Sequence, residues 1–490
     1  MRAALALGRR PPPVAGSLDS PALLRAYPGL RAARDAGGMR ERLQAALVGP
    51  RAGGGSVARC AVAQAICDPP GTCLVRYEIE LGGPAPGAPA HLVTVRFFPT
   101  AAAADRYLRE RLRPLAERVG GRPELRALAT PAAVLPDIRA TAAVFPVDPD
   151  LPTLVDATDD ARVTRALARE APVPLAVARC DVSRGHYGRR HRCVLRYELD
   201  GDGAGSGSGR RTLYGKVAAD DRGARALRVM AALRAMPRVE GGHAPAIPEP
   251  LLYSPAMRLL VLEELPGAPV VGRLLRMRIR REPAREPGAL GLEQAVEACA
   301  HAAAYLHASP VEPGPPRTAA GELAELAAGV DAMRPVAPEL ASWLEARLGT
   351  VEDRLAGSSR LAHRLSHGDF TSTQLLADGR ACGLVDFDTV CHAEPALDLG
   401  QFTAHLRVAC RKAERRAGAS RAELADRLCE RFLDVYARST PGGPPAARRL
   451  LRRARAYELV SLLRLAIHSW QKAKTDRLGD ALEVIEERRR

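Results

Sequence analysis

The sequence contains very little lysine. Only four of its 490 residues are lysine, although Lys and Arg together number 72, so nearly all of the positive charge is arginine. A formal net charge of +16 normally suggests a polyanionic partner, because a basic surface releases counterions when it binds one. Here the arginines are spread along the whole chain, as expected for coding bias in a GC-rich genome, and form no single stripe. Nucleic-acid binding is therefore not the favoured role.

Cysteine and long apolar runs are also scarce. The ten cysteines include no CxxC pair and no Cys/His cluster with zinc-ligand spacing, which argues against a zinc site. No run of about 18 apolar residues appears, so we expect no transmembrane helix. The uncharged stretch from Ala3 to Gly8 is too short for the core of a signal peptide. These absences predict a cytoplasmic protein with reduced cysteines and no membrane partner.

An internal repeat occupies the first half of the chain. The segments VARCAVAQAICDPPGTCLVRYEIE (57–80) and VARCDVSRGHYGRRHRCVLRYELD (177–200) are identical at nine of 24 positions. The same offset of 120 residues aligns Arg96 with Lys216. Each copy predicts two strands, a third strand, an Ala/Leu/Arg-rich helix and a closing strand.

The second half, from about residue 271, changes to helical periodicity. Apolar residues recur at i, i+3 and i+4 in 291–309, which is typical of an amphipathic helix. The sequence therefore divides into a Pro-rich leader with a helical segment, a first copy of the repeat, a second copy and a helical region, with the boundaries 1–56, 57–150, 151–270 and 271–490. Further helices are predicted at 338–357, 421–439 and 445–470.

Polar residues gather between apolar runs in HRLSHGDFTSTQLLADGRACGLVDFDTV (363–390). The pattern predicts a β-hairpin that turns at Asp378-Gly379 and whose returning strand carries Asp386 and Asp388. The hairpin brings Asp386 back beside the loop that carries Asp369. Two neighbouring carboxylates repel each other unless a cation or a shared proton neutralises them, and Mg²⁺ prefers such hard oxygen ligands.

These residues resemble the aminoglycoside phosphotransferases and choline kinases, the small-molecule branch of the protein-kinase-like fold. The matching motifs are His367-Gly368-Asp369, then Asp386-Phe387-Asp388, then EPALDLG with Asp398. Gln374 stands where the family usually has Asn, as in maltokinases. The resemblance implies an α+β, two-lobed fold with an antiparallel-sheet small lobe and a mostly helical large lobe, preceded here by a degenerate duplicate of the small lobe.

The resemblance also implies a role for each motif residue. Asp369 would be the catalytic residue that accepts the proton of the substrate hydroxyl. Gln374 and Asp386 would hold Mg²⁺, and Asp388 would be a further metal ligand or would contact metal-bound water. Support of the catalytic loop by hydrogen bonds would come from His367 and Asp398.

The nucleotide half of the site is expected in the second copy of the repeat. Lys216 would contact the α- and β-phosphates, and backbone groups of the hinge residues Glu263, Glu264 and Leu265 would pair with the adenine edge. The basic turn SRGHYGRRHR (183–192) is either a phosphate-covering loop or a solvated basic turn. Since 221–237 contains no Glu to pair with Lys216, either Lys216 pairs directly with Asp386 or catalysis is attenuated.

The first copy has Arg96 in place of the lysine and lacks the basic turn. We expect this copy to bind no nucleotide and to act as a cap over the second copy, or as a surface for a protein partner or self-association. Maltokinases similarly carry an extra N-terminal cap.

The predicted function is ATP- and Mg²⁺-dependent transfer of the γ-phosphoryl group to a hydroxyl of a small molecule of aminoglycoside, sugar or amino-alcohol type. The alternative is a catalytically attenuated pseudokinase that acts as a nucleotide-binding or regulatory module. A third possibility, nucleic-acid binding, predicts a steep salt dependence. The substrate stays open, because acidic residues in 321–353 could receive a cationic substrate or could simply form a solvated helix face.

Overall fold

The structure is a computed structural model of the chain. It describes residues 11–12, 16–49, 56–69, 71–82, 90–171, 177–188, 192–200, 210–237, 243–282, 290–312, 314–379, 381–419, 422–440 and 443–489. The Gly/Ser-rich loop at 201–209 and residues 189–191 of the basic turn lie outside these ranges.

Two antiparallel five-stranded sheets with the same strand order make up the first half. The first sheet has the order β1-β2-β3-β5-β4 and the second β6-β7-β8-β10-β9. The bounds of the first are β1 (Ser56–Asp68), β2 (Thr72–Gly82), β3 (His91–Phe97), β4 (Ala132–Leu135) and β5 (Ala140–Val144). The bounds of the second are β6 (Arg179–Tyr187), β7 (Arg192–Asp200), β8 (Arg211–Ala218), β9 (Pro250–Ser254) and β10 (Leu259–Glu263).

Strand register shows that the two sheets are copies of one unit. Arg96 lies on β3 opposite Leu74 and Thr141. Lys216 lies on β8 opposite Val194 and Leu260. Val194 aligns with Leu74 at the offset of 120 residues, and Leu260 aligns with Thr141 at an offset of 119, which applies to the last strand of each copy. The first copy thus keeps the backbone of the second and differs in the side chain at the lysine position.

Helices follow the third strand in both copies. In the first copy, α4 (Ala101–Tyr107) continues through a π-helical turn, η4 (Leu108–Leu112), into α5 (Arg113–Val119). In the second copy, α8 (Arg222–Ala235) buries Ala226, Val229, Met230 and Leu233, whose spacing forms one apolar stripe. Before these units, the leader contains α2 (Pro21–Ala26) and α3 (Ala36–Leu43), and α6 (Leu154–Ala157) with α7 (Asp160–Arg169) joins the two copies.

The second half is a helical lobe built around one buried helix, α13. This helix packs against α14, α15 and α16 and buries most of its residues. The bounds of the helices are α9 (Val271–Arg280), α10 (Leu292–Ala308), α11 (Ala319–Met333), α12 (Pro338–Ala356), α13 (Pro395–Ala417), α14 (Ala422–Arg438), α15 (Gly443–Gln471) and α16 (Thr475–Arg489). The short strands among them are β11 (Ala268–Pro269), β12 (Arg364–Ser366), β13 (Leu375–Asp378), β14 (Ala381–Leu384) and β15 (Cys391–Ala393).

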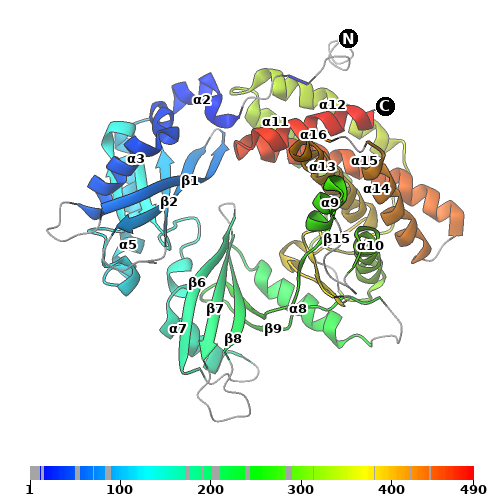
Figure 1. The fold of residues 1–490 in the computed structure, drawn as a ribbon, viewed down its shortest axis with the longest axis horizontal. Helices are drawn as coiled ribbons and strands as arrows, with labels where there is room; N and C mark the ends of the chain where they lie inside the picture. Colours follow the sequence, from blue (N-terminus) through cyan, green and yellow to red (C-terminus); the bar gives the residue numbers. More distant parts are fainter. Residues whose placement is uncertain are drawn as a thin grey trace.

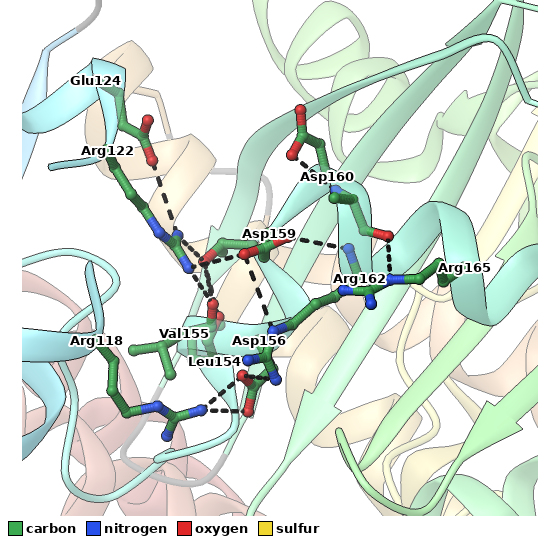
Figure 2. Close-up of polar contacts among 12 residues, drawn as sticks. Arg118, Arg122, Glu124, Leu154, Val155, Asp156, Asp159, Asp160, Arg162 and Arg165 are labelled. Carbon is green, nitrogen blue, oxygen red and sulfur yellow. Dashed lines mark hydrogen bonds and ion pairs between the residues drawn. The ribbon is translucent and has the colours of Figure 1, made fainter. Parts of the chain in front are cut away.

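The first sheet, the second sheet and the helical lobe lie around a common centre, as Figure 1 shows. Arginines at and just beyond the end of α5 in the first copy bind the segment that leads into the second (Figure 2). Arg118 donates to both carboxylate oxygens of Asp156 at 2.6 and 2.7 Å, and Arg122 donates to Thr158 Oγ1 at 3.0 Å. These contacts fix the two copies against each other.

The first copy and the leader also contact the helical lobe. Gln471 Nε2, at the end of α15, donates to Asp68 Oδ1 at 3.1 Å, and Ser20 Oγ of the leader donates to the Val336 carbonyl at 2.6 Å. The first copy therefore touches both of the lobes that the motifs predicted. The predicted fold class, a two-lobed α+β fold preceded by a duplicated sheet, is confirmed. Within the described ranges no helix is long and apolar enough to cross a membrane.

Candidate active site

The loop that carries His367, Gly368 and Asp369 runs from β12 to β13. Strand β12 pairs with β15, and β13 pairs with β14, so both ends of the loop are held by strand ladders. Gly368 has φ 76°, and a Cβ at this position would meet the Thr389 carbonyl oxygen at 2.3 Å. Only glycine fits this close approach, which explains the central residue of the motif.

The returning strand is shorter than the sequence predicted. Strand β14 ends at Leu384, so the expectation that Asp386 and Asp388 lie on it is wrong. Asp386 has φ 70° and ψ 54°, a left-handed conformation that aspartate tolerates better than most residues, and Asp388 lies in the 3₁₀ turn η7 (Phe387–Thr389). The backbone therefore turns after the strand, and both carboxylates reach the same cation.

That cation is Lys216 on β8. Its Nζ lies 2.5 Å from Asp386 Oδ1 and 2.9 Å from Asp388 Oδ1, and the lysine side chain is 15% exposed. Burial opposes the charge of Lys216, but Asp388 and Asp386 outweigh it and raise the pKa of the ammonium. Burial also opposes ionisation of Asp386, yet the charges of Lys216 and Arg192 hold the pKa of that carboxyl well below its usual range.

Lys216 thus takes the direct pairing with Asp386 that the sequence left as one of two possibilities. Helix α8 contains no glutamate that could pair with it. The two aspartates before the helix are engaged elsewhere: Asp220 accepts from Arg222 Nε at 2.7 Å, and Asp221 accepts from the Tyr253 hydroxyl at 2.8 Å. The two carboxylates after β14 therefore replace the helix glutamate that the family pattern predicts.

Asp369 lies close to this cluster and is held by a glutamine. Gln401 Nε2 on α13 donates to Asp369 Oδ1 at 3.1 Å, while Gln401 Oε1 accepts from the Phe370 N–H at 3.1 Å. Burial raises the pKa of Asp369, and the charge of Asp386 raises it further. A carboxylate with a raised pKa is a better proton acceptor than an ordinary one.

Arg192 reaches the same three carboxylates from the start of β7. Its guanidinium lies 4.0 Å from Asp369 Oδ2 and 3.7 Å from Oδ2 of both Asp386 and Asp388. Arg192 ends the basic turn that the sequence offered as a phosphate-covering loop. The described part of this turn therefore sends a second cation toward the acidic centre.

Asp398, at the start of α13, supports the loop backbone. It is fully buried and accepts from the N–H groups of His367 at 2.7 Å and Gly368 at 2.9 Å. His307 Nε2 lies 3.1 Å from the same carboxylate, and the Tyr436 hydroxyl lies 2.8 Å from His307 Nδ1. Burial opposes the charge of Asp398, but the hydrogen bond and charge of His307 lower its pKa overall.

The His367 ring packs under the loop. Its Nε2 lies 2.9 Å from the Val385 carbonyl, and its Nδ1 is buried with no hydrogen-bond partner among the described residues. Arg317 Nη1 donates to the Gly368 carbonyl at 2.8 Å, and Thr389 Oγ1 donates to the His367 carbonyl at 3.0 Å. The backbone around Gly368 is thus held from outside the loop: its N–H groups are bonded to α13, and its carbonyls to Arg317 and Thr389.

The backbone brings Gln374 beside the acidic centre. The Val385 N–H donates to the Gln374 carbonyl at 2.9 Å, which sets Gln374 next to the residue that precedes Asp386, and its side chain is half-buried. Two carboxylates and an amide oxygen are hard donors of the kind Mg²⁺ binds, and Asp386 and Asp388 already converge on one cation. The donor set fits a magnesium ion, although among described residues no group of three His, Cys, Asp or Glu side chains is placed to hold a metal.

The predicted hinge connects β10 to β11. The Glu263 N–H donates to the Glu249 carbonyl at 2.9 Å, and the Glu263 side chain pairs with Arg211. Glu264 accepts from the Tyr214 hydroxyl at 3.2 Å. Leu265 covers Gly383 of the β13–β14 hairpin, where a Cβ would lie 2.2 Å from Leu265 Cδ2.

Four residues of this site were not singled out from the sequence: His307, Arg317, Gln401 and, individually, Arg192. Gln401 could have been found, because it lies three residues after Asp398 on the same helix and so shares its face. Arg317 comes from a Pro/Gly-rich linker and His307 from an Ala-rich helix. Neither has a local pattern that marks it.

In the first copy, the equivalent of Lys216 is engaged by its own neighbours. Arg96 Nη2 lies 2.7 Å from Asp150 Oδ2, and its guanidinium lies over the Tyr107 ring at 4.8 Å. The pair is largely buried, with Arg96 14% exposed. No carboxylate corresponding to Asp386 approaches it among the described residues.

Comparison with known proteins finds a family model that matches part of the chain. Residues 207–441 match the sequence model of the phosphotransferase enzyme family. No curated protein matches the sequence.

Three solved structures illustrate the structural likeness. The GDP complex of wild-type aminoglycoside 2'-phosphotransferase-IIIa has 14% identity and a TM-score of 0.40, with 63% of this chain and 92% of that chain covered. Choline kinase from Cryptosporidium parvum Iowa II has 9% identity and a TM-score of 0.45, with 66% and 94% covered. A choline/ethanolamine kinase family protein from Mesorhizobium loti has 15% identity and a TM-score of 0.39, with 67% and 99% covered.

The family match begins before β8 and ends after α14, so it includes Lys216, the catalytic hairpin and Asp398. Over these residues the chain carries the sequence pattern of the phosphotransferase enzyme family, as its catalytic-loop motifs predicted.

Proposed function

We propose that this protein is an ATP- and Mg²⁺-dependent kinase of a small molecule that bears a hydroxyl group. The observation that carries the proposal is the convergence of Asp386 and Asp388 on Lys216, with Asp369 beside them on a loop held by α13. Phosphoryl transfer needs mainly positioned charges and a proton acceptor, and this cluster supplies both.

In the proposed reaction, the acceptor hydroxyl oxygen forms a bond to the γ-phosphorus of ATP while the bond to the bridging oxygen breaks, which releases ADP. The hydroxyl proton passes to Asp369, whose raised pKa suits it to accept one. Gln401 fixes the orientation of the Asp369 carboxylate. Asp386, Asp388 and Gln374 would hold Mg²⁺, which when bound neutralises phosphate charge.

The small lobe would hold the nucleotide. Lys216 would exchange one of its carboxylate contacts for the α- and β-phosphates, and Arg192 would add a second positive charge beside them. Because the Glu263 N–H is already bonded to Glu249, we propose that the adenine edge pairs with the backbone of Glu264 and Leu265 or with the carbonyl of Glu263.

We propose that the first copy acts within its own chain, as a cap on the small lobe, and not primarily as a surface for a partner. Its contacts with the second copy and with α15 support this role. Arg96, which stands where the second copy has Lys216, is bound to Asp150, so no nucleotide site is proposed there. The ten cysteines form no disulfide bond with one another. The cytoplasmic location of the protein stays a prediction.

The decisive experiment compares Asp369→Asn with Asp378→Asn, the same substitution on the exposed turn of the same hairpin. ADP release should be followed with ATP, Mg²⁺ and a panel of sugars, amino alcohols, aminoglycosides and their phosphorylated or carboxylated derivatives. We expect Asp369→Asn to lower kcat by about 10²–10⁴-fold, the range typical of a lost general base, and Asp378→Asn to leave it unchanged.

The pseudokinase alternative predicts a different result. ATP would raise the melting temperature of the wild-type protein and of both variants equally, but no acceptor would produce ADP release that depends on Asp369. That outcome would replace the enzyme proposal by a nucleotide-binding role.

A further inference from the structure

A cavity of about 630 Å³ lies beside the candidate active site and belongs to no assigned function. It lies between β1 and β2 of the first copy, the end of β6 in the second copy and the link between α15 and α16. We call it the interlobe cavity. The basic residues that line it, with one histidine, are Arg34, Arg76, Arg184, His186, Lys472 and Lys474.

The lining is strongly cationic. Glu78 is the one acidic side chain among the described lining residues, and it is engaged with Arg184 at 3.3 Å. Two of the four lysines of the chain, Lys472 and Lys474, lie on this wall. Of the other two lysines, Lys216 lies at the candidate active site and Lys412 on α13, so three of the four lie at that site or on this wall.

Arg76 carries the argument for a ligand. It is 2% exposed and lines the cavity, and its Nη1 donates to Gln64 Oε1 at 2.8 Å and to the carbonyls of Tyr187 at 3.2 Å and Gly188 at 2.7 Å. It forms no ion pair with a described residue, and its Nε is buried without a hydrogen-bond partner. Buried Asp148 experiences the charge of Arg76, but the two form no ion pair and Asp148 accepts instead from the Tyr187 hydroxyl, so an anion in the cavity would compensate the guanidinium more directly.

The cavity adjoins the acidic centre through His186. Strand pairing places His186 opposite Val194, and Val194 opposite Lys216, so the histidine and the nucleotide lysine share one face of the sheet. Burial and the charges of Arg192, Lys472 and Lys474 lower the pKa of the imidazole, while the charge of Asp386 opposes them, so the histidine interacts both with the lysines of the cavity and with the acidic centre. A molecule in the cavity would therefore extend toward Asp369 and the phosphate site.

We infer that the interlobe cavity binds an anionic group, a phosphate or a carboxylate, of the hydroxyl-bearing acceptor. This inference rests on the proposed function and narrows its substrate class. The cationic wall disfavours a polycation such as an aminoglycoside, because like charges repel in a partly desolvated cleft.

Several of the acidic residues in 321–353 that could have received a cationic substrate are bound to arginines instead. Glu322 is buried between Arg317 at 2.7 Å and Arg464 at 2.5 Å. Farther along, Asp331 and Glu345 both pair with Arg334 at 3.1 and 3.0 Å.

The first test is kinetic and uses matched acceptors: glycerol against glycerol 3-phosphate and glycerate, and glucose against glucose 6-phosphate and gluconate. We expect an anionic member to be the better substrate. Lys472→Gln/Lys474→Gln should raise its KM by roughly tenfold for each ionic hydrogen bond lost, with the KM for ATP unchanged. The control is Arg278→Gln/Arg427→Gln, which removes two exposed positive charges far from the cavity.

The second test does not depend on turnover. Inorganic phosphate, compared with sodium chloride at equal ionic strength, should raise the melting temperature of the wild-type protein. Lys216→Gln, which alters the nucleotide site, should keep this stabilisation, whereas Lys472→Gln/Lys474→Gln should lose it.

The two proposals fail in different ways. If neutral acceptors react as well as their anionic partners and the lysine double variant behaves like the arginine control, the anionic substrate class is wrong and the kinase proposal stands. If no acceptor gives Asp369-dependent ADP release, the kinase proposal is wrong. The phosphate experiment then decides whether the cavity binds an anion. The anion site is wrong if phosphate does not raise the melting temperature of the wild-type protein, or if it raises that of Lys216→Gln and of Lys472→Gln/Lys474→Gln equally.

Discussion

Arg76 of the first copy holds the basic turn between β6 and β7. Replacing Arg76 by lysine tests whether the first copy positions this turn for nucleotide binding. The arginine donates to two adjacent carbonyls, at 3.2 and 2.7 Å, and its guanidinium stacks on the Tyr187 ring at 3.7 Å. Lysine keeps the positive charge in the interlobe cavity. It cannot stack as a plane on the Tyr187 ring, and both carbonyl bonds come from Nη1, which lies farther from the backbone than a lysine Nζ, so we expect lysine to lose at least one of them.

The magnitude follows from these contacts. A hydrogen bond to a charged donor contributes about 1.5–3 kcal/mol, and a partly buried cation–π stack adds about 0.5–2 kcal/mol. Losing one carbonyl bond and the stack therefore removes about 2–5 kcal/mol from the ordered turn, a factor of roughly 30–5000. Part of this loss lowers overall stability, so we expect the KM for ATP to rise by at least about tenfold.

The assay is ADP release as a function of ATP concentration, combined with the melting temperature of each protein. The control is Arg59→Lys on β1, whose side chain is 67% exposed and pairs with Glu80 at 2.7 Å within the same sheet. A lower melting temperature with an unchanged KM for ATP would mean that Arg76 only stabilises the interface. An Arg76→Lys protein that matches wild type in both measurements would refute the reasoning altogether.

Three further predictions concern the helical lobe and its loop. Because Asp369 acts as a carboxylate and burial raises its pKa, kcat/KM should fall as the pH falls through that pKa. Arg192→Gln removes a positive charge that lowers the pKa of Asp369, so the acidic limb of the pH profile of kcat/KM should move to higher pH. An acidic limb that stays in place or moves to lower pH contradicts this prediction. Gln401→Leu frees the Asp369 carboxylate and should lower kcat about 10–100-fold without changing the KM for ATP, measured by steady-state kinetics. Two 2.6 Å bonds join Arg453 to Glu394, and Arg453→Met leaves the Glu394 carboxylate buried without its cation. Urea unfolding should show that the free energy of unfolding falls by about 3–5 kcal/mol, and a fall below about 1 kcal/mol would contradict the prediction.

The fold could be predicted largely because its signals are local. The repeat at constant offset predicts two similar sheets, and the strand register bears out the alignment of Arg96 with Lys216. The helices of the second half follow from apolar periodicity, as for α10, which spans Leu292–Ala308 within the predicted 291–309. Hydrophobic spacing is sufficient for such elements, since burial of one face fixes them.

The details of the candidate site depend on contacts between distant segments, which no local pattern encodes. The strand was predicted to continue through Asp386 because its residues are apolar and aromatic, but the left-handed backbone at Asp386 ends it earlier. Arg317 acts on the loop from a linker that carries no motif of its own, and Gln401 acts on it from α13, three residues after Asp398. The role of Arg317 follows only from the packing of the linker against the loop.

The contacts of the first copy have a consequence for motion. Gln471 binds it to the helical lobe through Asp68, Gly188 binds it to the second sheet through Arg76, and the hinge joins that sheet back to the helical lobe at β11. Kinase-like lobes release products by rotating apart, and such steps often limit turnover. The contacts of the first copy thus close a circuit, and the lobes can rotate apart only when its contacts with one of its two neighbours break. On the proposed kinase function, detachment of the first copy would then gate the release of ADP.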